Sequence, residues 1–512
     1  MTDWTHGYVA DLDYTYGYYR ELTPQILYTA TLAKGLEAGD AMGCQSYCEL
    51  GCGQGFSLNV LAAANPQTQF YGTDFNPNQI AGALRLAKAA GTAGDNLHFF
   101  DTAFADFAAE PSLPATFDVI ALHGIYSWIN PENRQHIVDF VKQKLAVGGL
   151  LYISYNAFPG WAPIMPLREL MLDHAETTTG PVLPRVEAAL TFINQLKETN
   201  PSYFTANPTV APRFEKLQGM SRNYLAHEYF NRDWTPFYFS DVAGDFAEAK
   251  LGFAGSAHLI DHLDSVCLSD AQQKLLATIG DPVRREGLRD VMINQQFRKD
   301  IYIKGQVQHS TTSAEAAWMN TRFALTVARA DTALKFNGPL GEVTMSAEAY
   351  NPILDNLAAG PKTLKQMVEQ PEIGAMSWPS LRQAMAVLIG ANYVQPCLPA
   401  KDDAKRKKRT DALNRAIAEQ SKAKSELSYM ASPVTGGGVQ VDRMSQLFLT
   451  AERAGEKDPV AHVWSLLKSQ GQRLLKDGKP LDQEADNLAE LKRLYQVYQD
   501  KMRAVLKGIG IA

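Results

Sequence analysis

The segment CELGCGQGFSLNVL (residues 48–61) contains three glycines at alternate positions, directly after the acidic Glu49. The residues before the glycines read as a buried strand and those after them as a helix, so the glycines form a turn in which the backbone can approach a ligand closely. The G-x-G-x-x-G fingerprint of dinucleotide sites fails, because residue 56 is Phe. An acid beside the loop suits a cationic ligand better than a pyrophosphate, which favours S-adenosylmethionine with its ammonium and sulfonium groups.

A second acid follows at the end of the next expected strand, QTQFYGTDF, where Asp74 stands. A carboxylate at this place can accept both ribose hydroxyls of a nucleotide, in nicotinamide sites and methyl-donor sites alike. The alternative is an aspartate that only forms the turn before Pro77. Together with the glycine loop, Asp74 favours the methyl donor over a nicotinamide cofactor.

The turn after the third expected strand is placed to contact the adenine, through Ala103 and stacking of Phe104. Many methyltransferases have an acid where Ala103 stands, and Asp101 or Asp106 would then substitute for it. The full set of expected cofactor-binding residues is Tyr19, Arg20, Glu49, Gly51, Cys52, Gly53, Gly55, Asp74, Phe75, Ala103, Phe104, His123 and Gly124.

Aromatic and polar residues gather just after the fourth and fifth expected strands, FDVIALH and LLYISYN. Ligands of open α/β sheets bind at these carboxyl ends, although each residue alone could also serve core packing. An aromatic wall would desolvate an amine acceptor and lower its pKa, Asn156 would orient it, and His123 would be the general base for a hydroxyl acceptor. The expected catalytic residues are His123, Tyr126, Trp128, Tyr155 and Asn156.

Several motifs of the sequence resemble those of a known family. The motifs HGIYSWI (123–129), ISYNAFPGW (153–161) and YLAHEYF (224–230), with Phe297 and Arg298, are similar to class I S-adenosylmethionine-dependent methyltransferases that carry a methyltransferase regulatory domain. The resemblance implies a Rossmann-like sheet and methyl transfer. Some members methylate lysines of outer-membrane proteins of intracellular bacterial pathogens, and others have no assigned substrate.

The resemblance therefore favours N-methylation of protein lysines. A glycan or small-molecule O- or N-methyltransferase is the alternative, and so is a non-catalytic protein that binds the cofactor for regulation. A net charge of −6 argues against nucleic acid as the main partner. The absence of an apolar run of ~18 residues predicts no membrane span, and the N-terminus does not read as a signal peptide, which indicates a cytoplasmic protein. Five cysteines without matching histidines predict no metal site.

The chain of 512 residues is long enough for two to three domains. The expected fold class is α/β, a Rossmann-like sheet with a helical insertion, followed by a mostly helical C-terminal region. The tyrosine-rich start, with Tyr14, Tyr16, Tyr18 and Tyr19, predicts a lid in which Arg20 pairs with the methionine carboxylate. Tyrosines that cover the sheet's edge are the alternative.

The expected division of the chain has five parts. They are a lid or extension at 1–45; the core at 46–162 and 231–308; a helical insertion at 163–230 that shapes the acceptor pocket or a homodimer contact; a regulatory, winged-helix-like domain at 309–400; and a basic tether with a helical tail at 401–512.

Overall fold

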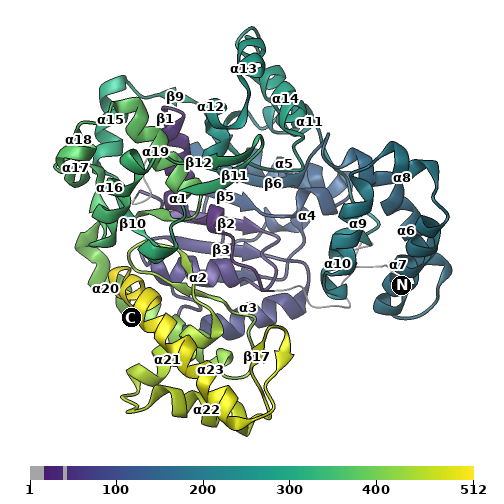
Figure 1. Cartoon of the computed structure of the whole chain (residues 1–512). Coiled ribbons are helices and arrows are strands. Elements are labelled where there is room, and N and C mark those ends of the chain that lie inside the picture. Colours follow the sequence, from purple (N-terminus) through teal and green to yellow (C-terminus); the bar gives the residue numbers. More distant parts are fainter. Residues whose placement is uncertain (1–15, 39–42) are drawn as a thin grey trace.

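The computed structural model describes residues 16–38 and 43–512, so Tyr14 of the expected lid lies outside the described residues. A seven-stranded sheet runs through the middle of the molecule (Figure 1) in the order β4-β3-β2-β5-β6-β8-β7, with β8 antiparallel to both neighbours. Its strands are β2 (Ser46–Leu50), β3 (Gln69–Thr73), β4 (Leu97–Phe100), β5 (Phe117–Leu122), β6 (Leu145–Asn156), β7 (Leu251–Ser256) and β8 (Phe297–Lys304). The predicted α/β class is confirmed.

Helices cover both faces of this sheet, which is why its central strands bury apolar side chains on both faces. Successive side chains point to opposite faces: Val119 joins one apolar cluster and Ile120 joins the other. The first cluster includes residues of α2 (Phe56–Ala64) and α3 (Pro77–Ala90), and the second includes residues of α5 (Pro131–Lys144) and α11 (Phe239–Ala247).

The start and end of α3 follow from local sequence. The Asn76 side chain accepts a hydrogen bond from the backbone N–H of Asn78, Pro77 occupies the first turn, and Gly91 ends the helix in a left-handed conformation. These signals fix where the helix sits relative to the end of β3, and hence where Asp74 points.

Between β6 and α11 the chain forms a separate helical layer, at the right of Figure 1. Its core contains Trp128, Trp161 and Trp234 in addition to apolar residues of the insertion itself. The layer consists of α6 (Met165–Thr177), α7 (Val182–Glu198), α8 (Ser202–Ala206), α9 (Val210–Gln218) and α10 (Arg222–Tyr229).

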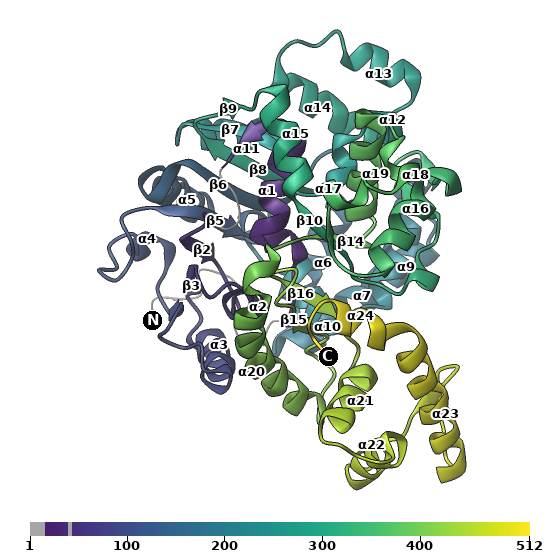
Figure 2. The same cartoon turned by 90° about the vertical axis from the view of Figure 1, so that its left-hand side faces the viewer.

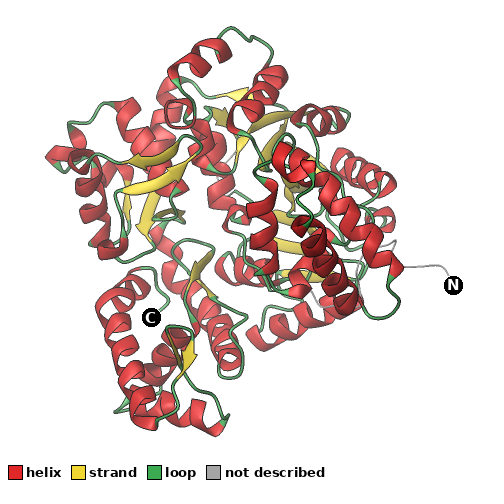
Figure 3. Cartoon of the chain, turned by 45° about the vertical axis from the view of Figure 1, so that its right-hand side comes forward, coloured by secondary structure: helices red, strands yellow, loops and turns green. Residues whose placement is uncertain are grey.

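The region after the large sheet contains a second, three-stranded sheet surrounded by helices (Figure 3) in the order β13-β10-β14. Its last strand, β14, pairs with β10, which precedes α16, α17 and α19, and not with a following strand that would form a wing. The winged-helix description of 309–400 therefore stays a prediction. The elements are α15 (Thr311–Asn320), β10 (Arg322–Leu325), α16 (Ala347–Ala358), β13 (Lys362–Thr363), α17 (Leu364–Met367), α19 (Trp378–Gly390) and β14 (Val394–Cys397).

The prediction of a solvated tether at 401–409 is wrong. This basic run opens the helix α20 (Asp403–Ser421), which packs against α2 and α3 beside the sheet (Figure 2). Arg406 is only 1% exposed and donates a 2.7 Å hydrogen bond to the carbonyl oxygen of Pro433. The glycine-rich segment 432–438 is buried as well. The C-terminal region is therefore part of the wall around the sheet. No helix among the described residues is long and apolar enough to cross a membrane.

Arg298 on β8 joins the sheet to α14 (Pro282–Ile293). It is 4% exposed, and its guanidinium donates hydrogen bonds to Asp300 at 2.9 Å, to Asp290 at 2.5 Å and to Glu286 at 3.1 Å. Three carboxylates thus share one buried cation. Removing that cation would leave uncompensated negative charge in a poorly solvated place.

We expect Arg298→Met to lower the free energy of unfolding by about 3–5 kcal/mol, because three buried carboxylates would lose the cation that they share. Urea denaturation followed by circular dichroism measures this change. Arg284→Met is the matched control, since Arg284 is exposed on α14. This substitution should change the free energy of unfolding by no more than about 0.5 kcal/mol. Equal losses for the two variants would contradict the role given to Arg298.

Candidate active site

A cavity of about 550 Å³ opens where β2, β3, β5 and β6 end. Ligands of open α/β sheets bind at this edge. Most of the residues predicted from sequence line it, although they come from segments more than a hundred residues apart: Tyr19, Glu49, Gly51, Cys52, Gly53, Gly55, Asp74, Phe75, Ala103, Phe104, His123, Gly124, Trp128 and Asn156.

The glycine loop is built so that the backbone itself forms the cavity wall. Gly51, Gly53 and Gly55 have φ angles of +69°, +52° and +59°, in the left-handed region that other residues rarely adopt. A Cβ atom on Gly51 would lie 2.5 Å from Cδ1 of Ile125, and one on Gly55 would lie 2.6 Å from Cβ of Ala83. The sequence requirement for glycine is thus both conformational and steric.

Asp74 holds this loop in place. Its Oδ2 accepts a 2.9 Å hydrogen bond from the backbone N–H of Gly53, and its Oδ1 accepts one of 3.0 Å from Asn76. Burial raises the pKa of Asp74 to about 6 despite these two bonds. The carboxylate lines the cavity and keeps further acceptor capacity, as a ligand's hydroxyl groups require.

Glu49 is the unusual group of the cavity. It is 5% exposed, and its Oε2 has no hydrogen-bond partner among the described residues. Burial and the neighbouring charge of Asp74 raise the pKa of Glu49 to about 8. A buried carboxylate without a partner is costly, and an ammonium group placed beside it would remove that cost. The site therefore fits the charged amino-acid end of S-adenosylmethionine.

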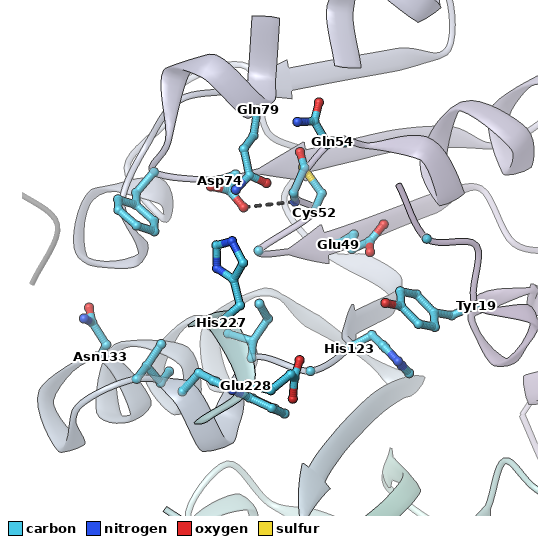
Figure 4. A pocket seen from close by; sticks show the side chains of 18 of the residues that line it. Tyr19, Glu49, Cys52, Gln54, Asp74, Gln79, His123, Asn133, His227 and Glu228 are labelled. Carbon is cyan, nitrogen blue, oxygen red and sulfur yellow. Dashed lines mark hydrogen bonds between the residues drawn. The ribbon is translucent and has the colours of Figure 1, made fainter. Parts of the chain in front are cut away.

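His123 forms the floor of the cavity between two tyrosines. The ring of Tyr19 stacks on it with centroids 3.7 Å apart, and its Nδ1 lies 2.8 Å from the hydroxyl of Tyr152. Burial lowers the pKa of His123 to about 3, so the imidazole is neutral around pH 7. Figure 4 shows Tyr19 and His123 together at one end of the cavity.

Three predicted site residues point elsewhere, and their expected roles are wrong. The guanidinium of Arg20 donates a 2.8 Å hydrogen bond to the carbonyl oxygen of Ile389 instead of facing the cavity. The hydroxyl groups of Tyr126 and Tyr155 donate 2.6 Å hydrogen bonds to Asp245 and Asp300, respectively, in the core. A buried phenol needs such a partner, and neither tyrosine lines the cavity.

The cavity wall opposite the glycine loop was not predicted from the sequence. There the helix α10 and the chain after it bring in polar side chains, with Asn133 of α5 nearby (Figure 4). The motif YLAHEYF contained this information as a neighbouring His and Glu, but no local pattern shows that this helix folds back over the glycine loop. The missed residues include Asn133, His227, Glu228, Tyr229, Asp233 and Gln296.

We expect Asp74→Asn to weaken S-adenosylmethionine binding about 10- to 100-fold, the usual worth of hydrogen bonds to a charged group. Titration calorimetry measures the change, and NAD should not bind the wild-type protein. Asp139→Asn is the matched control, because Asp139 is exposed and does not line the cavity. Unchanged affinity in Asp74→Asn, or tight NAD binding, would contradict the assignment of the pocket.

Two family models match the chain. A methyltransferase domain matches residues 48–151, and a predicted methyltransferase regulatory domain matches residues 221–304. The second span contains α10, β7 and β8. The region that carries the family's regulatory name thus completes the sheet and the cavity, and it does not coincide with the regulatory domain expected at 309–400.

Similar proteins extend this match to the whole chain. The uncharacterized protein sll1526 of Synechocystis is 44% identical over 509 residues, which are 99% of this chain and 100% of that protein. The uncharacterized protein RP789 of Rickettsia prowazekii is 27% identical over 257 residues, 49% of this chain and 44% of that one. The solved structure of PKMT2 from Rickettsia typhi in complex with AdoHcy has a TM-score of 0.68 at 18% identity, and covers 95% of this chain and 98% of that one.

The strand order, the cavity that suits a cationic nucleoside ligand, and the two matching models agree. The protein belongs to the class I S-adenosylmethionine-dependent methyltransferases that carry a methyltransferase regulatory domain.

Proposed function

We propose that the protein methylates the side-chain amine of lysine in a protein substrate. The observation that carries this proposal is the charge of the cavity. Among the described residues that line it there is no lysine or arginine. A cavity of this charge favours a cationic acceptor and disfavours an anionic one. Its four carboxylates belong to Glu49, Asp74, Glu228 and Asp233.

The carboxylates divide between two walls. Glu49 and Asp74 lie by the glycine loop, on the cofactor side, whereas Glu228 lies on the facing wall together with His227 (Figure 4). An acceptor with its own positive charge would therefore meet a favourable field after the cofactor has compensated the first pair. This arrangement supports an amine acceptor that arrives as an ammonium ion.

Aromatic side chains supply the second requirement, which is to bring the amine to its neutral form. Trp128, Trp161, Tyr229 and Phe297 line the cavity. Aromatic faces attract an ammonium group, while the loss of water lowers the pKa of an amine and favours the nucleophilic form.

S-adenosylmethionine supplies a methyl group activated by the sulfonium. The nitrogen of the neutral amine would bond to this carbon as the carbon–sulfur bond breaks, with its electron pair left on the departing S-adenosylhomocysteine. The methylated ammonium product would then lose a proton to solvent. The contribution of the protein is to hold the amine in line and to exclude water.

The main alternative, a hydroxyl acceptor, needs a general base near the methyl group. His123 is the residue expected for that role, but its low pKa and its contact with Tyr152 leave a neutral, weakly basic imidazole. This observation favours an amine over a hydroxyl acceptor. The resemblance to a family that includes protein-lysine methyltransferases adds independent support.

We expect the wild-type protein with labelled cofactor to add methyl groups to lysines of poly-L-lysine and of proteins in its own cell lysate, as mass spectrometry of the products would show. Trp128→Ala should lower the turnover number at saturating cofactor at least about tenfold, because the acceptor wall is lost. Trp128→Phe, the matched control, keeps an aromatic face and should retain most turnover.

The pH dependence distinguishes the two acceptor classes. For an amine, the rate should rise with pH as the acceptor loses its proton, and His123→Ala should lower turnover less than about fivefold at saturating cofactor. Loss of nearly all turnover in His123→Ala, together with a single ionisation near neutral pH in the wild-type profile, would instead establish hydroxyl activation. Methyl groups found only on hydroxyls would rule out the lysine proposal directly.

A further inference from the structure

Residues 18–21, which we call the strap, pass along the cofactor end of the cavity and continue into α1 (Pro24–Ala33). The four residues of the strap contact three parts of the molecule. One binds the cavity, one the large sheet and two the C-terminal region. These contacts connect the C-terminal region to the wall of the cofactor site.

Tyr19 is the strap residue that lines the cavity. Its ring lies on His123, and its backbone N–H donates a 3.4 Å hydrogen bond to Oγ of Ser57 on α2. The same hydroxyl donates to the carbonyl oxygen of Gly17, which also lines the cavity. The position of the Tyr19 ring thus depends on where the backbone of the strap is held.

Tyr18 points the other way, into the hairpin of β15 (Tyr429–Ala431) and β16 (Gly438–Gln440). Its hydroxyl accepts a 2.6 Å hydrogen bond from the backbone N–H of Gly438, and its ring centroid lies 5.0 Å from that of Tyr429. A Cβ on Gly438 would lie 2.8 Å from Cζ of Tyr18. Gly437 and Gly438 therefore make room for Tyr18.

Arg20 and Glu21 fix the other side of Tyr19. Arg20 donates its 2.8 Å hydrogen bond to Ile389, in the last turn of α19, where the helix dipole favours a cation. Glu21 accepts a 2.6 Å hydrogen bond from Lys299 on β8. Although burial opposes the charge, the Lys299 ammonium holds the pKa of Glu21 at about 2.

We propose that Tyr18 and Arg20 are positioning residues for the cofactor. Through Gly438 and Ile389, the C-terminal region holds the strap on both sides of Tyr19 and keeps the Tyr19 ring on His123, and this sets the affinity for S-adenosylmethionine. Release of either anchor weakens cofactor binding, so the C-terminal region controls the cofactor site. The mechanism holds for any methyl acceptor and is therefore independent of the lysine assignment.

A double-mutant cycle on the full-length protein tests this coupling, because it separates an effect that acts through Tyr19 from a general loss of stability. The affinity for S-adenosylmethionine is measured by calorimetry for Tyr18→Phe, Tyr19→Ala and the double variant. Tyr18→Phe keeps the ring but loses the hydroxyl. It should weaken binding at least about fivefold, because the hydroxyl is hydrogen-bonded both to Gly438 and to the Thr23 side chain 2.8 Å away, whereas the double variant should bind no more weakly than Tyr19→Ala alone.

The second anchor provides a separate test if either tyrosine variant fails to fold. Arg20→Gln should weaken the binding of S-adenosylmethionine by a similar factor. Added to Tyr19→Ala, the same substitution should cause no further loss of affinity. Tyr498→Phe is the matched control: Tyr498 is a buried tyrosine of the C-terminal region whose hydroxyl bonds to Glu452, and its loss should leave the affinity unchanged. Unaltered affinity in Tyr18→Phe and Arg20→Gln, or equal losses with and without the Tyr19 ring, would overturn the proposal.

Discussion

Two buried acids at the ends of neighbouring parallel strands determine much of this structure. Glu49 and Asp74 lie in a cavity whose described lining contains no lysine or arginine. Backbone N–H groups bind Asp74, but Oε2 of Glu49 has no such partner among the described residues. Burial of the Glu49 carboxylate thus costs free energy in the unliganded protein. A cationic ligand beside Glu49 removes this cost, and this makes binding of the charged methyl donor favourable.

The rest of the molecule keeps those acids away from water. The glycine loop brings backbone to the cavity edge, α10 covers it from the facing side, and the strap closes the end next to His123. The C-terminal region supports the arrangement from outside, since α20 packs against α2 and α3 and the hairpin β15–β16 holds Tyr18. Cofactor binding and the packing of the outer regions therefore depend on the same contacts.

Local sequence was enough to predict the parts that local physics determines. The glycine spacing, the strand-end Asp74 and the apolar strands predicted the sheet and the cofactor half of the cavity. It was not enough for Arg20, Tyr126 and Tyr155, whose hydrogen-bond partners lie 119 to 369 residues away in the chain. Nor does composition distinguish a solvated basic run from α20, in which Arg406 is buried by carbonyl groups that folding brings to it.

The acceptor side of the cavity could not be predicted from local sequence either. His227 and Glu228 reach the cavity only because the inserted helices fold back over the strand ends, and periodicity does not indicate which face of a helix meets a distant loop.

The central claim is that a cationic cofactor compensates Glu49, and proton release tests it most directly. With its pKa raised to about 8, Glu49 is mostly protonated at pH 7 in the free protein, and a bound ammonium group lowers that pKa. Calorimetry at pH 7 in two buffers of different ionisation enthalpy should therefore show about one proton released per S-adenosylmethionine bound. Glu49→Gln should release almost none. No proton release by the wild-type protein, or equal release by the variant, would contradict the account.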